Sequence, residues 1–264
     1  MVDFRKRLTR ARPEKLLDPV EIYDTLDRAS DTGPLRPVQL AVLKKWHSDY
    51  RTKQDVILKL HTGQGKTLVG LLLLKSKLNE GGGPALYLCP SNLLIQQTCA
   101  QAEQFGIRYC TADKNGIPQD FLDGNAILIT TVKKLFNGLT QFGTGPSATP
   151  ISAIVVDDCH ASIDLIRESF TIKFKRAEPA YKELLGLFSE ALKNQGAGTF
   201  SDIVAGGYDA LLPVPYWEWQ DRQEEVLGVL SKHKDSLSVK FAWPILKDIL
   251  GQCQCVISGK AIEI

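Results

Sequence analysis

The chain has 264 residues, of which 44% are hydrophobic and 23% are charged. This composition is that of a globular protein, and it excludes a chain disordered throughout, a collagen-like repeat and a small disulfide-rich domain. The 32 basic and 30 acidic residues leave a net charge of +2, and six basic residues lie within residues 1–17. We expect a basic arm over residues 1–19, which either contacts a phosphate backbone or is simply a solvated surface segment.

Short apolar runs of strand character alternate with helix-favouring stretches through the first 160 residues. The strand candidates are residues 56–60, 85–89, 107–110, 126–130 and 153–157. Residues 67–78 and 92–103 have helical composition. Apolar strands that alternate with helices indicate a parallel sheet covered by helices on both faces. We therefore predict an α/β fold for this part of the chain.

The alternation stops at residue 161. Residues 177–194 and 220–233 have helical periodicity, so we predict a mostly helical insertion over residues 161–250. Strand character returns near the end of the chain, and we expect residues 251–264 to rejoin the first domain and to end truncated. The insertion contains Tyr216, Trp217, Trp219 and Trp243. They form either the core of a small helical subdomain, which we favour, or a surface that stacks on nucleic acid or binds a protein.

The chain has no apolar run long enough to span a membrane, since the longest is the short segment over residues 68–74. Its six cysteines have no C-x-x-C spacing, which argues against a zinc site. Cysteines scattered in apolar runs are typical of thiols in a reducing compartment. We predict a cytoplasmic protein with no membrane partner.

A phosphate-binding loop is predicted at residues 61–67, His-Thr-Gly-Gln-Gly-Lys-Thr, because they follow a predicted strand and open a predicted helix. The two glycines let backbone N–H groups turn toward phosphates. Lys66 would bridge the β- and γ-phosphates, and the Thr67 hydroxyl would bind Mg²⁺. The nucleotide-binding residues expected here are Thr62, Gly63, Gln64, Gly65, Lys66 and Thr67.

Two carboxylates stand at the end of the predicted strand over residues 153–157. Asp157 is the expected Mg²⁺ ligand, and Asp158 is the candidate to orient or activate a water molecule. His160 suits a coupling or hydrogen-bonding role better than metal binding. The alternative is that these residues only cap a helix at a strand-to-helix turn.

These motifs resemble those of the DEAD/DEAH-box helicases of superfamily 2. Residues 35–40, Leu-Arg-Pro-Val-Gln-Leu, are similar to the adenine-reading motif of that family, which implies that Gln39 and Arg36 contact ATP. Tyr23, further upstream, is either a stacking partner for the base or a core residue of a helix. The acidic box of the family is Asp-Glu-x-Asp or Asp-Glu-x-His, whereas this chain has Asp157-Asp158-Cys159-His160. The shorter Asp158 suggests slow hydrolysis.

Two further segments resemble motifs that contact nucleic-acid phosphates. Residues 88–97 are similar to the P-T-R-x-L-x-x-Q motif of the family, although Asn92 stands where relatives often have Arg. Residues 127–134 are similar to a threonine-bearing strand end of the same groove. The resemblance implies contacts with DNA or RNA from Pro90, Ser91, Asn92, Gln97, Thr130, Thr131 and Lys133. The alternative is that both segments are ordinary ends of parallel strands.

The resemblance covers residues 20–160 and implies the first RecA-like lobe of an ATP hydrolase or helicase that uses ATP and Mg²⁺. We find no good copy of the Ser/Thr-Ala-Thr motif after the acidic box, and no second RecA-like lobe with its arginine finger. We therefore expect a fragment with weak or no hydrolysis until a second lobe is supplied in cis or by a partner chain. Two other functions stay open, a nucleotide-gated binding module and a degenerate ATPase with a structural role.

Overall fold

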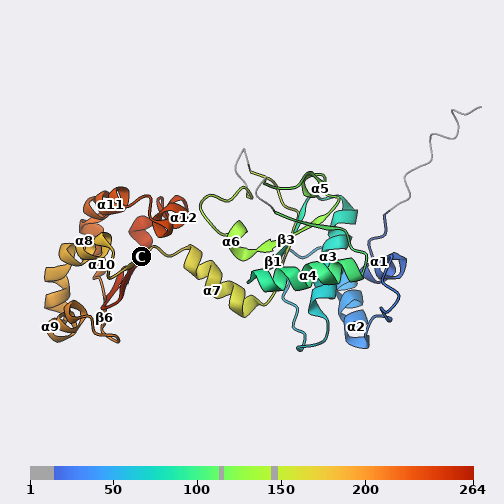
Figure 1. The fold of residues 1–264 in the computed structure, drawn as a ribbon, viewed down its shortest axis with the longest axis horizontal. Coiled ribbons are helices and arrows are strands. Elements are labelled where there is room, and N and C mark those ends of the chain that lie inside the picture. Colours follow the sequence, from blue (N-terminus) through green and yellow to red (C-terminus); the bar gives the residue numbers. More distant parts are fainter. Residues whose placement is uncertain (1–14, 113–115, 144–147) are drawn as a thin grey trace, which may run out of the picture. The chain divides into compact units, whose positions relative to one another are not determined.

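The computed structural model describes residues 15–112, 116–143 and 148–264, and the chain divides into two compact units (Figure 1). The first unit extends to Val132 and resumes over Gln141–Ser162. The second unit comprises Lys133–Thr140 and Ile163–Ile264. Residues 1–14, and with them most of the predicted basic arm, lie outside the described residues.

A parallel four-stranded sheet forms the centre of the first unit. Its strands, in spatial order, are β2 (Tyr109–Thr111), β3 (Ile127–Thr131), β1 (Ala85–Cys89) and β4 (Ala153–Val156). Every residue of β1 is buried, as expected for a central strand with both faces covered. The predicted α/β fold with a parallel sheet flanked by helices is confirmed.

The longest helix of the first unit, α3, packs against this sheet. The helices of the unit are α1 (Pro19–Thr25), α2 (Pro37–Lys45), the π-helical turn η2 (Trp46–Tyr50), α3 (Lys66–Glu80), α4 (Asn92–Gln104), α5 (Gln119–Leu122) and the start of α6 (Val132–Leu135). The apolar run over residues 68–74 is buried in α3 and joins the core formed with β1 and β3. The left-handed glycines Gly65 and Gly81 flank this helix at its two ends. A left-handed glycine such as Gly81 commonly terminates a helix at its C-terminal end, because it lacks a Cβ.

The prediction of a strand at residues 56–60 is wrong. These residues form neither a helix nor a strand, and no backbone hydrogen bond joins them to any residue that the structure describes. Ile57 is 91% exposed. Among the described strands, β4 has β1 as its one neighbour, so the sheet ends at β4. Apolar composition does not make a strand by itself, because a strand needs a partner for its backbone N–H and C=O groups.

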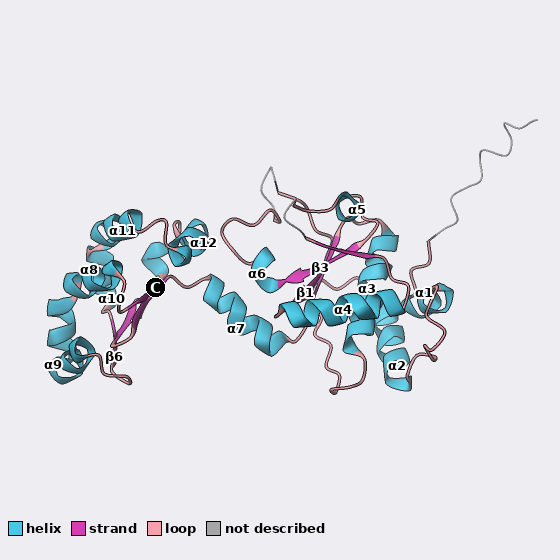
Figure 2. Cartoon of the chain, in the orientation of Figure 1, coloured by secondary structure: helices cyan, strands magenta, loops and turns pink. Residues whose placement is uncertain are grey.

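The second unit combines several helices with a small antiparallel sheet (Figure 2). The strands, in spatial order, are β5 (Lys173–Lys175), β8 (Ala261–Glu263), β7 (Val256–Ser258) and β6 (Leu211–Pro213). The helices are the end of α7 (Cys159–Ser169), then α8 (Pro179–Leu187), α9 (Ser189–Ala205), α10 (Tyr216–Asp221), α11 (Gln223–Lys232), α12 (Leu237–Leu246) and the short 3₁₀ helix η3 (Leu250–Gln252). The mostly helical character predicted for this region is present.

The last residues of the chain do not join the parallel sheet, contrary to the expectation for residues 251–264. β7 and β8 pair with each other, and their outer edges pair with β6 and β5. Ile257 lies directly opposite Ile262, and both are fully buried in the core of the second unit. Cross-strand packing of these two side chains favours a local hairpin within that core.

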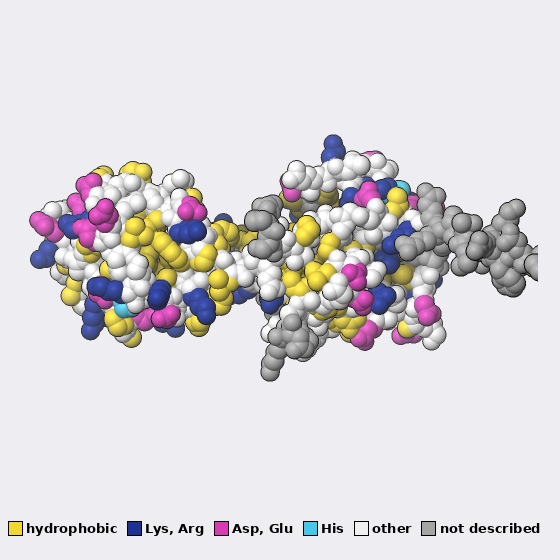
Figure 3. All heavy atoms as spheres, turned by 90° about the horizontal axis from the view of Figure 1, so that it is seen from above, with side chains coloured by type: hydrophobic (Ala, Val, Ile, Leu, Met, Phe, Trp, Pro, Cys, Tyr) yellow, Lys and Arg dark blue, Asp and Glu magenta, His cyan; other side chains and the backbone are white. Residues whose placement is uncertain are grey.

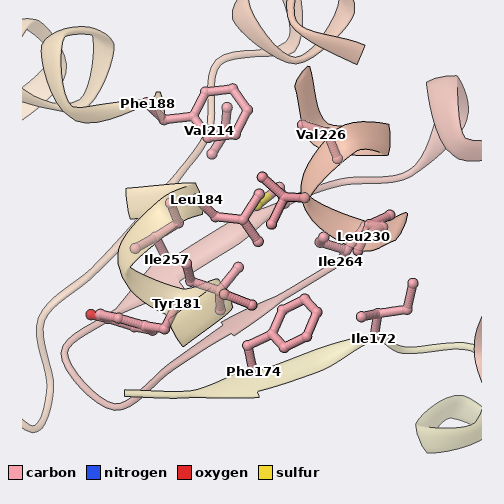
Figure 4. Packing of buried hydrophobic residues seen from close by; sticks show 14 of the residues in the cluster. Ile172, Phe174, Tyr181, Leu184, Phe188, Val214, Val226, Leu230, Ile257 and Ile264 are labelled. Carbon is pink, nitrogen blue, oxygen red and sulfur yellow. The ribbon is translucent and has the colours of Figure 1, made fainter. Parts of the chain in front are cut away.

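The core of the second unit collects apolar side chains from its sheet and its helices (Figure 4). Phe174 of β5, Leu184 of α8 and Leu230 of α11 are among them. Trp219 is 1% exposed, and its indole Nε1 donates a hydrogen bond to the Leu250 carbonyl oxygen at 3.0 Å. Its ring also stacks on Phe188, with centroids 6.0 Å apart. The core interpretation of the aromatic residues therefore fits Trp219.

The other aromatic residues of the insertion differ from Trp219. Trp243 is partly buried against the same core, whereas Tyr216 and Trp217 are 65% and 67% exposed. The core interpretation therefore does not fit Tyr216 and Trp217.

The surface of each unit carries both basic and acidic side chains, as the small net charge predicts (Figure 3). Within the described parts of the chain, we find no helix with the length and apolar character that a membrane crossing requires.

Candidate active site

The predicted phosphate loop joins residues 56–60 to the N-terminus of α3. Gly63 and Gly65 have φ angles of 80° and 73°, a left-handed conformation that favours glycine. The Gln64 N–H donates to the His61 carbonyl oxygen at 3.3 Å, which closes the turn. The N-terminus of a 15-residue helix follows at once, and helix N-termini attract anions through their free N–H groups and partial positive charge.

Lys66 and Thr67 occupy the first turn of α3. The Lys66 side chain is exposed, and no ion pair with another described residue engages it. Its ammonium group is therefore available to an anion at the helix N-terminus. Thr62 is also exposed, whereas Gln64 is half-buried within the loop.

Arg36 and Gln39, the predicted adenine-side residues, both contact this loop. The Arg36 guanidinium donates to the Gly63 carbonyl oxygen, and the Gln39 amide donates to the Gly65 carbonyl oxygen at 3.3 Å. The Gln39 Oε1 atom accepts the Arg36 backbone N–H at 2.9 Å. Gln39 is only 4% exposed. In this structure the two side chains hold the backbone of the loop.

Tyr23 is a core residue, in agreement with the second of its two predicted placements. It is 2% exposed, and its hydroxyl donates to the Gly33 carbonyl oxygen at 2.6 Å. Its ring lies 6.0 Å from the ring of Phe105 and carries the Arg28 guanidinium over one face. These contacts explain the position of the Tyr23 side chain, and no stacking on a nucleotide base is needed to explain it.

The acidic box forms a tight turn between β4 and α7. The Asp157 backbone N–H donates to the Leu88 carbonyl oxygen at 2.9 Å, which extends the pairing with β1, and its Oδ1 accepts the Asp158 N–H at 3.0 Å. Ser162 is fully buried, and its hydroxyl donates a hydrogen bond to the Asp157 carbonyl oxygen at 2.8 Å. The Ser162 backbone N–H donates to the Asp158 carbonyl oxygen at 2.9 Å. His160 lies exposed in the first turn of α7.

Asp158 is the one non-glycine residue with a positive φ, 44°, in the described part of the chain. A left-handed conformation costs a residue with a Cβ about 1–2 kcal/mol, and such strain clusters at functional sites. We expect Asp158→Gly to raise the free energy of unfolding by up to about 1 kcal/mol, because glycine adopts this φ freely but loses more backbone entropy on folding. Thermal denaturation of the variant and the parent measures this difference.

A matched control for Asp158→Gly is Ala161→Gly, which places a glycine at an exposed position of α7, the helix that follows this turn. That change should lower the free energy of unfolding by about 1 kcal/mol. If Asp158→Gly destabilises the protein as much as Ala161→Gly does, the turn is not strained at Asp158.

Tyr87, which sequence analysis did not single out, links the two predicted magnesium ligands. It lies in the middle of β1 and is 1% exposed. The Thr67 hydroxyl and the Asp157 carboxylate both lie near its phenol and act on its pKa. Burial raises the pKa of the Tyr87 phenol far above its ordinary value, and the negative charge of Asp157 raises it further, so the phenol stays protonated. The one available sequence signal is a single aromatic residue within a strand of small and aliphatic residues and a cysteine.

The donor set around Tyr87 suits Mg²⁺ bound together with a nucleotide. Thr67 offers a hydroxyl oxygen and Asp157 a carboxylate, and Mg²⁺ is usually held by one or two such groups plus phosphate oxygens and water. No group of three His, Cys, Asp or Glu side chains that could hold a metal alone occurs among the described residues. A magnesium ion here would depend on the oxygens of the nucleotide.

The predicted nucleic-acid residues lie at the ends of β1 and β3. These neighbouring strands run parallel, with Leu88 beside Thr130 and Cys89 beside Thr131, so the segments after them start at the same edge of the sheet. Ser91 accepts the Leu94 N–H at 3.3 Å and caps α4. The exposed residues of this set are Ser91, Asn92, Gln97 and Lys133, whereas Pro90 and Thr131 are half-buried.

Burial limits one further residue of the predicted set, and an ion pair engages another. Thr130 is only 6% exposed. Lys133 belongs to the second unit, where its ammonium group pairs with Glu168 at 2.9 Å.

Comparison with known proteins gives two matches. The sequence pattern of the DEAD/DEAH box helicase family matches residues 36–193, which is more than half of the chain. The ATP-dependent DNA helicase Hel308 of Pyrococcus horikoshii is 27% identical over 111 residues. That alignment covers 40% of this chain and 15% of the relative, so the chain matches only a small part of that protein. No solved structure matches the chain.

Proposed function

We propose a function from the premise that this chain belongs to the DEAD/DEAH box helicase family. In this proposal the first unit is the ATP-binding lobe of an ATP-dependent motor that acts on DNA or RNA. The observation that carries it is that Thr67, at the start of α3, and Asp157, which follows β4, both lie near the buried Tyr87 side chain. The matched residues begin at Arg36 and include the phosphate loop and the acidic box.

In this proposal, different residues of the first unit bind different parts of Mg-ATP. Lys66 and the N-terminus of α3 bind the phosphates and offset their charge. Thr67 and Asp157 hold Mg²⁺, which when bound neutralises charge on the phosphate oxygens. Asp158 orients the attacking water, and its short side chain favours slow turnover. Arg36 and Gln39 position the loop beneath the phosphates.

Nucleic acid is contacted through its backbone at the ends of β1 and β3. Among the proposed contact residues there, Ser91, Asn92 and Gln97 are exposed, polar and neutral, and Lys133 is exposed and basic, which suits phosphate and sugar contacts with little base specificity. We propose that a second lobe, in cis or on a partner chain, supplies an arginine finger and so completes hydrolysis. We also propose a cytoplasmic location, in keeping with six cysteines that are all free thiols.

Binding of Mg-ATP tests this function directly. A fluorescent ATP analogue is titrated with the chain in Mg²⁺, and Lys66→Ala is compared with the parent. We expect the variant to bind at least about tenfold more weakly, since a charge-assisted hydrogen bond contributes about 1.5–3 kcal/mol. Lys77→Ala, at the far end of α3, is the matched control and should bind as the parent does.

The same titration separates the other functions. If Lys66→Ala and the parent bind alike or not at all, a degenerate ATPase is favoured. If ATP changes the affinity for DNA or RNA but the protein completed with a second lobe shows no directional unwinding, a nucleotide-gated binding module is favoured.

A further inference from the structure

Tyr87 stands where the sheet meets α3, beneath the proposed magnesium site. In the register of the sheet it lies between Ile129 of β3 and Val155 of β4. Tyr87, Ile129 and Cys89 contribute to the same buried core as α3. The ring is therefore held between the sheet and the helix that follows the phosphate loop.

Gly70 of α3 makes room for that ring. A Cβ atom at this position would lie 2.9 Å from Cε2 of Tyr87 and 3.1 Å from Cγ1 of Val155, closer than side chains pack. A glycine inside a helix destabilises it relative to alanine, so its presence at a buried position points to a packing requirement. Here the requirement is the close approach of α3 to Tyr87.

The positions of Gly70 and Val155 fix where the Tyr87 hydroxyl can reach. Thr67 precedes Gly70 by three residues, so both lie on the same face of α3. Asp157 follows Val155 by two residues along the chain that leaves β4. A ring packed against Gly70 and Val155 thus brings its hydroxyl toward Thr67 and Asp157, the two side chains that also act on its phenol electrostatically.

The hydroxyl has the hydrogen-bonding capacity for both contacts. A phenol donates one hydrogen bond and accepts others, so it can donate to the Asp157 carboxylate and accept from the Thr67 hydroxyl. Thr67 and Asp157 come from segments far apart in the sequence, and the phenol is a common partner of both.

We propose that Tyr87 is a positioning residue that holds Thr67 and Asp157 in place for Mg²⁺, and that Gly70 is required for it to do so. This inference rests on the proposed Mg-ATP site. Tyr87 itself touches neither the metal nor the nucleotide. Its effect is that of an outer-shell partner, which orients the atoms that bind the metal.

The test is Tyr87→Phe, which keeps the ring and removes only the hydroxyl. Binding of a fluorescent ATP analogue is measured over a range of Mg²⁺ concentrations and again with EDTA. We expect the Mg²⁺ concentration at half-saturation to rise about tenfold, the lower end of what outer-shell partners of metal ligands contribute. Binding in EDTA should change little, because Lys66 and the loop remain intact.

Tyr181→Phe is the matched control. Tyr181 is 2% exposed in the second unit and donates its hydroxyl to the Ser258 carbonyl oxygen at 2.7 Å, so this variant also loses a buried phenol hydrogen bond. It should leave the Mg²⁺ midpoint unchanged. In Gly70→Ala the added Cβ would overlap the Tyr87 ring, so this variant should also raise the Mg²⁺ midpoint, as Tyr87→Phe does.

A Mg²⁺ midpoint for Tyr87→Phe equal to that of the parent, with Lys66→Ala still weakened, overturns the role of Tyr87 and leaves the proposed function standing. Equal losses in Mg²⁺ and in EDTA also overturn it, since they indicate a packing role. A parent chain that binds no Mg-nucleotide overturns both proposals.

Discussion

Trp219→Ala should lower the free energy of unfolding of the second unit by about 3–5 kcal/mol, the range for removing a large aromatic side chain from a core. The indole is 1% exposed and stacks on Phe188. The substitution also leaves the buried Leu250 carbonyl oxygen without the indole N–H that it accepts. Urea denaturation of the whole chain, with peptide-resolved hydrogen exchange to localise the effect, measures this loss.

Trp217→Ala is the control for that experiment, because it removes the same side chain from the same short helix. Trp217 is 67% exposed, and a surface substitution of this kind changes stability by about 0.5 kcal/mol or less. Similar losses for the two variants would contradict the assignment of Trp219 to the core and Trp217 to the surface.

Gly65→Ala should weaken binding of Mg-ATP by about a hundredfold, equivalent to about 2.8 kcal/mol. The residue has a φ of 73°, and its added Cβ would lie 2.2 Å from Nε2 of Gln39. Relief of that overlap requires the loop or Gln39 to move, and the loop is where the phosphates are proposed to bind. Equilibrium titration of the fluorescent ATP analogue measures the change.

Gly81→Ala separates backbone strain from the collision with Gln39. Gly81 has a φ of 84° at the other end of α3, and a Cβ there would meet nothing within 4 Å. This variant should lose about 1–2 kcal/mol of stability through the left-handed conformation alone and bind nucleotide normally. If Gly65→Ala also binds normally, the contact between Gln39 and the loop does not matter for the site.

Sequence patterns predicted the parts of the fold that are determined locally or by strong apolar runs. The strand prediction for residues 85–89 has the bounds of β1, and the helical stretch over residues 92–103 ends one residue before α4 does. The two failures both concern strand partners. Residues 56–60 have the composition of a strand, but no strand pairs with them. Strand β7 pairs with β6 in the second unit and not with the parallel sheet. Apolar composition does not encode which strand lies next to which.

The candidate site shows the same division between local and distant information. Loop glycines and the lysine that follows them form a contiguous pattern, so the phosphate loop could be located from sequence. The involvement of Tyr87 depends on α3, β1 and β4 meeting at one place, which no local pattern specifies. The contact of Gln39 with Gly65 likewise joins two elements that the sequence separates.

The hydrogen bonds from Arg36 and Gln39 to the phosphate loop bear on selectivity among nucleotides. The Gln39 amide already donates to the Gly65 carbonyl oxygen and accepts the Arg36 N–H. Under the proposed function, a base that engages this amide competes with those contacts and so loosens the loop, whereas a base that cannot engage it leaves the loop held. Discrimination between bases then acts through the conformational equilibrium of the loop, at a distance from the base itself.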